Sequence, residues 1–178
     1  EKLRPGEPAT LDSSKNQIIT RFFDEFRYDL SKVGRYKFNR KLNVADRLLG
    51  CTLAENITVN GEVIYEAGTV VDKEVLEGLK PILADGYGEK EVLINNELDT
   101  YNKVQIVKVY SKKDSNKVVK IIGNDQSISI KRLTISDIYA SVSYYLNLLD
   151  GIGSIDEIDH LSNRRVRQVG ELLQNQFR

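Results

Sequence analysis

The sequence predicts an α+β fold in which helical segments at both ends flank a small inserted β-rich module. Apolar residues recur at helical spacing near both ends, whereas β-branched runs separated by turn residues fill the middle. The predicted division places residues 1–41 and 132–178 in a helical host part and residues 42–131 in the inserted module. A length of 178 residues suits one medium domain or two small ones.

The N-terminal part is predicted to hold an extended or turning segment followed by a helix. Two prolines and a glycine fall within residues 1–10, and isoleucines and phenylalanines then recur at helical spacing over 11–26. Asp12, Ser13 and Ser14 are the candidate N-cap residues. The phenylalanines indicate a packing face.

The stretch "RYDLSKVGRYKFNRK" (residues 27–41) mixes basic and aromatic residues with weak periodicity. Its basic side chains outnumber its one acid, Asp29. Such interleaving suits a nucleic-acid strand, because cations meet phosphates and rings meet bases. A solvated loop with a few anchoring aromatics fits equally well. The basic residues are Arg27, Lys32, Arg35, Lys37, Arg40 and Lys41.

The middle of the chain predicts a hairpin, a short helix and strands. An Asn60-Gly61 pair between β-branched runs is typical of a hairpin with a type I′ turn. Asp72 is placed to cap a helix that Gly86 ends and that Pro81 shortens or kinks. The predicted strands that follow are residues 91–97, 102–111 and 116–124.

Helical character returns at "LTISDIYASVSYYLNLLDGIG". Thr134 and Asp137 have the spacing of a capping box, and Gly151 and Gly153 are placed to end the helix. Its predicted apolar side holds Ile138, Val142, Tyr145, Leu146 and Leu149.

Three arginines, Arg164, Arg165 and Arg167, fall in the predicted opening turns of a last amphipathic helix. Cations at a helix N-terminus oppose the helix dipole, so an anion is expected nearby. Two sources fit: the acidic residues of the stretch 156–159 just before the arginines, or a phosphate backbone.

Composition excludes several classes of protein. The chain has 26 basic and 26 acidic residues and is 40% hydrophobic, as expected of a globular protein without the net charge of a dedicated nucleic-acid binder. One cysteine and one histidine make no internal disulfide and no metal site without carboxylates, which favours a reducing, cytoplasmic location.

No run is apolar enough to span a membrane. The start at Glu1 and the lack of methionine suggest a piece of a longer polypeptide.

No catalytic constellation is evident in the sequence. It contains no nucleophile elbow, zinc-protease motif, paired cysteines or phosphate-binding glycine loop. Cys51 is interpreted as a small buried apolar residue, and His160 as a partly buried histidine that bonds a backbone group at a turn. An independent enzyme is therefore not expected.

The motifs together resemble the β subunit of bacterial DNA-directed RNA polymerase, in the part that joins its lobe and protrusion. The resemblance rests on "KLRPGEP", "RFFDEFRYDLSKVGRYKFNRKL", "LTISDI" and above all "IDEIDHLSNRRVRQVGELLQNQFR", in this order. These motifs cover about residues 1–42 and 132–178. Residues 42–131 resemble, more loosely, a lineage-specific insertion of polymerases from Gram-positive type bacteria.

The resemblance implies a non-catalytic role within a nucleotidyltransferase complex. In this family the catalytic magnesium is held by aspartates of the partner β′ subunit, so no cofactor is expected in this chain. The segment would instead shape the main DNA cleft and contact the non-template strand near the transcription bubble.

The resemblance also implies a set of DNA-contacting residues. By position in the motif, Asp159 and Arg164 match a pocket for an unstacked non-template guanine, although Ser162 stands where the family usually has glycine. Arg165 and Arg167 are expected to neutralise phosphates or brace the fork. Arg4 and Arg27 match arginines along the path of the non-template strand.

The implied partners are DNA, the β′, α and ω subunits and a sigma factor, in the bacterial cytoplasm at the nucleoid. An alternative function assigns the main role to the inserted module, 42–131, as an interaction module for a transcription factor or partner subunit. Its β-rich make-up suits strand addition at an exposed sheet edge. Salt dependence separates the two, because phosphate contacts weaken steeply as salt rises.

Overall fold

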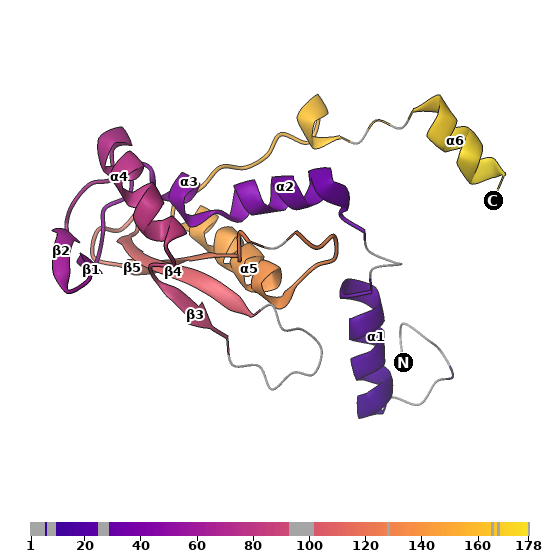
Figure 1. The fold of residues 1–178 in the computed structure, drawn as a ribbon, viewed down its shortest axis with the longest axis horizontal. Helices are drawn as coiled ribbons and strands as arrows, with labels where there is room; N and C mark the ends of the chain where they lie inside the picture. Colours follow the sequence, from indigo (N-terminus) through magenta and orange to yellow (C-terminus); the bar gives the residue numbers. More distant parts are fainter. Residues whose placement is uncertain are drawn as a thin grey trace.

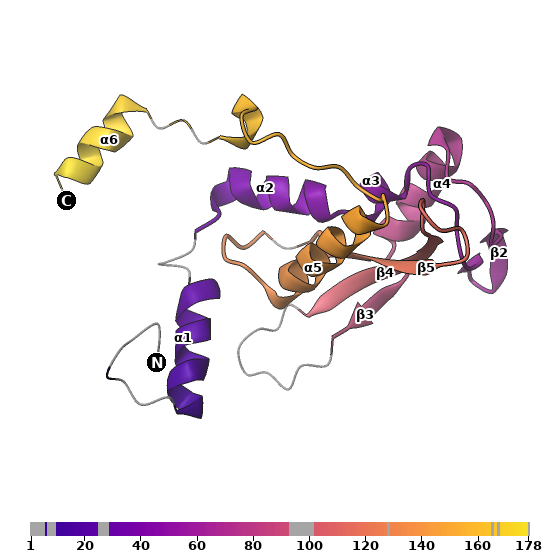
Figure 2. The same cartoon turned by 180° about the vertical axis from the view of Figure 1, so that it is seen from behind.

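The structure is a computed structural model, and it confirms the α+β prediction (Figure 1). It describes residues 6, 10–24, 29–92, 102–127, 129–164, 166 and 168–177. The central body contains a three-stranded antiparallel sheet and a separate two-stranded hairpin. Helices α1 and α6, at the two ends of the chain, stand apart from this body in both views (Figures 1 and 2).

The three-stranded sheet has the order β3-β4-β5 and carries most of the body. Strands β4 (Lys103–Tyr110) and β5 (Val118–Gly123) pair along their length, with Val107 opposite Ile121. Strand β3 (Glu89–Glu91) pairs with the start of β4. The predicted strands 102–111 and 116–124 are therefore confirmed, whereas most of the predicted strand 91–97 lies outside the described residues.

The hydrophobic core lies between this sheet, the short helix α3 (Val44–Leu48) and helix α4 (Lys73–Ala84). Leu48, Leu53 and Ile121 are fully buried there. Cys51 is also fully buried, as the sequence predicts. Burying these apolar side chains supplies the main favourable free energy of folding for the body.

The hairpin predicted at Asn60-Gly61 is confirmed. Strands β1 (Ile57–Val59) and β2 (Glu62–Tyr65) flank the pair, and φ is 53° at Asn60 and 88° at Gly61. Positive φ at both central residues is the requirement of a type I′ turn, and Asn-Gly is the pair that adopts it most readily.

Helix α4 also follows its sequence signals. The Asp72 carboxylate accepts a hydrogen bond from the Val75 N–H at 2.8 Å, and Gly86 follows the helix with φ of 91°. The helix continues three residues past Pro81 to Ala84, so proline does not end it directly.

Residues 31–42 form helix α2 (Ser31–Leu42), which the weak periodicity of the sequence did not predict. The buried side of this helix is made by Arg35 and Leu42. A buried arginine replaces the apolar residues that give an amphipathic helix its usual pattern. Arg35, counted above among the basic residues that suit nucleic acid, is therefore a structural residue.

Helix α5 (Ile135–Leu149) packs on β5. The side that faces the sheet is not the apolar side that the sequence indicates, but the opposite one. The capping box of Thr134 and Asp137 is confirmed. The apolar side is exposed, from 38% at Ile138 to 66% at Tyr145. The buried side is made by Ile135, Ser136, Asp137, Ala140, Ser143 and Asn147.

The buried polar residues of α5 explain this orientation. The Ser143 hydroxyl accepts a hydrogen bond from the Ile122 N–H at 3.1 Å and donates to the Lys120 carbonyl at 3.3 Å. These bonds satisfy backbone groups on the outer edge of β5. Small polar residues thus face the sheet because they complete its hydrogen bonding.

The terminal helices are α1 (Leu11–Phe22) and α6 (Val169–Gln176). Neither has a buried residue among those described, and Leu11, Val169 and Phe177 are at least 72% exposed. The N-cap of α1 is Thr10, whose hydroxyl accepts from the Ser13 N–H, so the proposed caps within 12–14 were wrong. Helix α1 therefore starts two to four residues earlier than those candidates imply.

Candidate nucleic-acid interface

The candidate site lies on an arm, residues 154–164, that leaves the end of α5 and extends toward α6 (Figures 1 and 2). Ile152 is fully buried at the point where the chain leaves the body. Gly153 turns the chain with φ of 99°, and a Cβ there would lie 3.0 Å from the Tyr144 ring. Beyond this turn the arm is exposed: Ile155, Ile158 and Leu161 are at least 76% accessible.

The root of the arm is fastened to two helices. The Tyr144 hydroxyl of α5 accepts from the Ser154 N–H at 2.9 Å and donates to the Ser154 carbonyl at 2.8 Å. The Lys41 ammonium of α2 donates to the same carbonyl at 3.0 Å and pairs with the Asp156 carboxylate at 2.7 Å. Four hydrogen bonds therefore fix where the arm starts and its direction.

The electrostatics of this root follow from its close contacts. Burial alone would raise the pKa of Tyr144, but the hydrogen bonds with Ser154 and the nearby Lys41 ammonium lower it. Lys41 and Arg47 both lie over the Tyr144 ring, 5.1 and 4.9 Å from its centroid. Burial lowers the pKa of Arg47 to about 10, so this guanidinium stays charged at neutral pH.

The tip of the arm is a single 3-10 turn, η1 (Leu161–Asn163). The His160 ring nitrogen Nδ1 accepts from the Ser162 N–H at 3.2 Å and caps this turn. The Asn163 amide donates to the Glu157 carbonyl at 2.8 Å. His160 bonds a backbone group as predicted, but it is exposed, not partly buried.

Asp159 and Arg164 are the candidate site residues that the structure brings together. The Arg164 guanidinium contacts the Asp159 carboxylate through Nη2, and its Nε donates to the Ile158 carbonyl at 3.3 Å. The two side chains are 82% (Asp159) and 55% (Arg164) exposed. Solvent screens such a pair, so it adds little to stability and both groups stay accessible.

The predicted helical setting is wrong for Arg164, the one of the three arginines that the structure describes. Arg164 has extended backbone angles, with φ of −113° and ψ of 135°, and helix α6 begins only at Val169. The helix dipole therefore exerts no direct penalty at Arg164. Its negative partner is Asp159, one of the two alternatives that the sequence left open.

The other four predicted contact residues lie outside the described residues. These are Arg4, Arg27, Arg165 and Arg167. Their assignment to DNA stays a prediction.

Sequence reasoning missed the residues that hold the arm in place. Lys41 was counted only as a basic residue, and Tyr144 was not singled out at all. Lys41 and Asp156 are 115 residues apart in the chain, so no periodicity or local motif connects them. Only the packing of α2 against α5 shows that they meet.

Nothing in the described part of the chain resembles a metal centre or a membrane anchor. No three His, Cys, Asp or Glu side chains among these residues are grouped to hold a metal ion. Across the same residues, no helix is both long and apolar enough to cross a bilayer.

Comparison with known proteins identifies the class of this chain. Residues 111–167, from the end of β4 through the arm, match the family model "RNA polymerase Rpb2, domain 2". The whole chain also aligns with proteins named DNA-directed RNA polymerase subunit beta. It is 49% identical over 187 residues to that of Enterococcus faecium, 50% over 184 to that of Geobacillus thermodenitrificans and 49% over 184 to that of Streptococcus thermophilus.

These matches define a segment of a multisubunit RNA polymerase. More particularly, the chain belongs to the bacterial β-subunit family, as its motifs indicate. All of this chain aligns, but it spans only about 15% of the length of the Enterococcus faecium relative and 16% of the Geobacillus thermodenitrificans one. The boundaries of the inserted module, 42–131, stay a prediction.

Proposed function

We propose that this chain is a non-catalytic segment of an RNA polymerase β subunit that helps form the main DNA cleft and contacts the non-template strand near the transcription bubble. The observation that carries the proposal is the exposed Asp159–Arg164 pair at the tip of an arm anchored at its root. The names of the relatives support a role in DNA-directed transcription.

The chemistry of the pair suits an unstacked guanine. A carboxylate accepts hydrogen bonds from the N–H groups of the guanine Watson–Crick edge, and a guanidinium donates to carbonyl or phosphate oxygens. The contact between Asp159 and Arg164 already places the carboxylate and the guanidinium side by side. A base that enters between them replaces an exposed ion pair at low cost.

The remaining parts of this function would belong to the assembled enzyme. Nucleotide transfer would occur on the β′ subunit, which would hold the catalytic magnesium, with α, ω and a sigma factor completing the complex in the cytoplasm at the nucleoid. Arg165 and Arg167 would neutralise phosphates at the fork, and Arg4 and Arg27 would follow the non-template strand.

A fork-junction DNA titration of the reconstituted polymerase tests the guanine contact. The non-template base just downstream is varied, and wild type is compared with Asp159→Ala and Arg164→Ala. We expect both variants to lose preference for guanine, by about 1–3 kcal/mol of discrimination, the range for a good base-edge contact.

Glu157→Ala is the matched control. Glu157 is an exposed acid of the same arm, and the contact it makes to Asn163 uses its backbone carbonyl, so the substitution leaves that contact in place. An unchanged guanine preference in all three variants, with assembly intact, contradicts the proposal.

A second candidate function, an interaction module within residues 42–131, is favoured by one observation. Val63 and Ile64 on the hairpin, and Val70 after it, are 47–58% exposed. The outer edge of β5 is occupied by α5, and β3 is short and charged, so neither edge of the sheet favours strand addition. The exposed apolar side chains of the hairpin are therefore the better candidate surface for a transcription factor.

Val63→Ser with Ile64→Ser should weaken binding of a sigma factor to core polymerase with little salt dependence. Unchanged sigma binding contradicts it.

A further inference from the structure

We infer that the exposed side of helix α2 binds single-stranded nucleic acid through a stripe of Lys32, Tyr36 and Arg40, separately from the arm. That this strand belongs to the DNA or RNA of a transcription complex rests on the proposed function. The contact itself is inferred from the geometry of α2.

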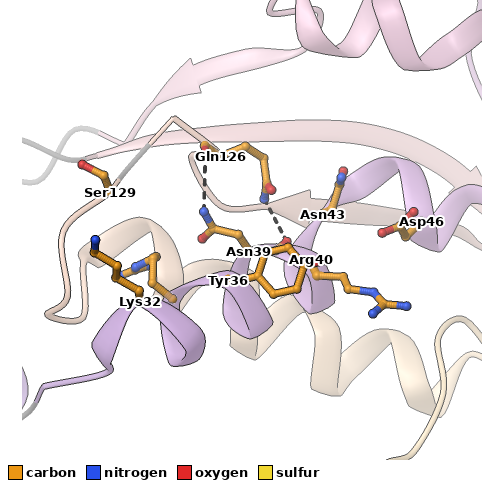
Figure 3. Close-up of a pocket in the computed structure, with 9 residues that line it drawn as sticks. Lys32, Tyr36, Asn39, Arg40, Asn43, Asp46, Gln126 and Ser129 are labelled. Carbon is orange, nitrogen blue, oxygen red and sulfur yellow. Dashed lines mark hydrogen bonds between the residues drawn. The ribbon is translucent and has the colours of Figure 1, made fainter.

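The stripe arises from helical spacing. Lys32, Tyr36 and Arg40 are each four residues apart in α2, so they lie on one side of the helix, about 6 Å apart along its axis. All three are exposed, and Tyr36 is 65% accessible. Figure 3 shows these three side chains projecting from the same helix.

The basic residues of α2 are not balanced by acidic residues within the helix itself. It has five basic residues and no acid. Arg35 is paired with Asp137, and Lys41 with Asp156, which leaves Lys32, Lys37 and Arg40 as exposed cations. Lys32 lies in the first turn of the helix, where the Asp29 carboxylate already accepts from the Ser31 N–H at 2.7 Å, so the cations without a partner in α2 itself are spread along its exposed side.

A groove of about 570 Å³ lies beside the stripe (Figure 3). Its far wall is Gln126, whose side chain donates to the Asn39 carbonyl at 3.1 Å, while the Asn39 amide donates to the Gln126 carbonyl at 3.4 Å. The residues that line it include one acid, Asp46, at the end beyond Asn43. Amide and cationic groups thus surround a hollow that can hold a polar ligand.

The groove is rigidly supported. Gln126 donates to the Asn124 side chain at 2.6 Å, and Asn124 donates to the buried Asp137 carboxylate at 2.8 Å. The same carboxylate holds Arg35 on the buried side of α2. Both walls are therefore fixed to one buried network, which limits the entropy lost when a ligand binds.

The exposed tyrosine favours a nucleic-acid strand over an acidic peptide. An aromatic ring between two cations offers a stacking surface for a base while the cations meet the flanking phosphates. Acidic side chains would use the cations but leave the Tyr36 ring without a stacking partner.

Photocrosslinking in the assembled polymerase identifies the ligand directly. Tyr36 is replaced by p-azidophenylalanine in the full-length subunit, and the open complex on promoter DNA is irradiated with each strand labelled in turn. We expect a crosslink to single-stranded DNA or to RNA. Crosslinks to polypeptide alone, or none with transcription intact, overturn the inference.

A titration with fluorescein-labelled single-stranded oligothymidylate gives the energetic test in core polymerase. Tyr36→Ala should weaken binding about 5- to 150-fold, the range for loss of one stacked base, and Tyr36→Phe should bind nearly as wild type. Lys32→Ala with Arg40→Ala should lower the slope of log affinity against log salt by about 1.4, because each phosphate contact to a single strand contributes about 0.7.

Lys37→Ala is the matched control. Lys37 is an exposed cation of the same helix, about 100° around the axis from Tyr36. Equal effects of the stripe and control variants overturn the inference. Because the probe contains no guanine, failure of the pocket at Asp159 and Arg164 would not change this result.

Discussion

Arg35 and Asp137, 102 residues apart in the sequence, form a buried ion pair that joins α2 to the start of α5. One guanidinium nitrogen lies 2.8 Å from both carboxylate oxygens, and the side chains are 5% and 0% exposed. The carboxylate also accepts from the Asn124 amide and the Thr134 N–H. One buried acid thus holds the helix cap, the loop after β5 and helix α2 together.

Breaking this pair should strongly destabilise the body. Arg35→Ala leaves the Asp137 charge buried and uncompensated, which costs about 3–5 kcal/mol of unfolding free energy. Urea unfolding followed by circular dichroism measures the loss. Lys80→Ala, which breaks the exposed Lys80–Glu77 pair, serves as the control and should change nothing measurable. Equal stability of the two variants would contradict this role of Arg35.

The hairpin turn gives a prediction about backbone conformation alone. A Cβ at Gly61 meets no atom within 4 Å, yet φ there is 88°. Gly61→Ala should therefore cost about 1–2 kcal/mol through strain and not through a clash. Gly61→Asn should cost less, because asparagine tolerates this region. Thermal unfolding of the two variants checks the order, and a reversed order would refute it.

The ion pair of Asp150 should contribute to the loss of stability at acid pH. Its carboxylate pairs with the Lys117 ammonium at 2.7 Å and accepts from the Ser111 hydroxyl at 3.0 Å. The hydrogen bond from Lys117 lowers the pKa of Asp150 below its ordinary value of 3.8. The unfolded chain then binds more protons than the folded one, so this stability is present above about pH 3.8 and is lost below it.

Asp150→Asn should therefore flatten the fall of unfolding free energy between about pH 5 and pH 3. Urea unfolding across that range measures the slope. A slope as steep as that of wild type would show that Asp150 makes no such contribution.

Cys51 reports on opening of the core. Its thiol is fully buried, and burial raises the pKa of Cys51, so the reactive thiolate is scarce in the folded state. We expect alkylation by iodoacetamide to be slow in the native chain and to accelerate with denaturant at the unfolding midpoint. Since the chain has one cysteine, mass spectrometry gives the rate without ambiguity. Rapid labelling of the native chain would contradict the burial of this residue.

The elements predicted from sequence are those with a local physical cause. Asn60-Gly61 adopts its turn from backbone preference, and Thr134 and Asp137 form their capping box from spacing alone. Helix α4 follows from the Asp72 cap and its apolar face. Each signal lies within a few residues of the structure that it produces.

The features that were missed depend on contacts between distant residues. Helix α2 buries Arg35, which needs Asp137 from far along the chain, so its own periodicity is weak. Helix α5 turns polar Ser143 inward because the edge of β5 needs hydrogen bonds, which leaves its apolar side exposed. In the candidate site, Asp159 and Arg164 were paired from their motif, but the root at Lys41 and Tyr144 was visible only in the structure.

We propose that the arm contacts the non-template strand beside an unstacked base. The most direct test of this contact is a cryo-electron microscopy structure of the full-length polymerase in an open promoter complex with guanine just downstream on the non-template strand. We expect to find that base within hydrogen-bond distance of Asp159, with Arg164 beside it. A structure in which the arm packs against protein, with both side chains remote from DNA, would contradict it.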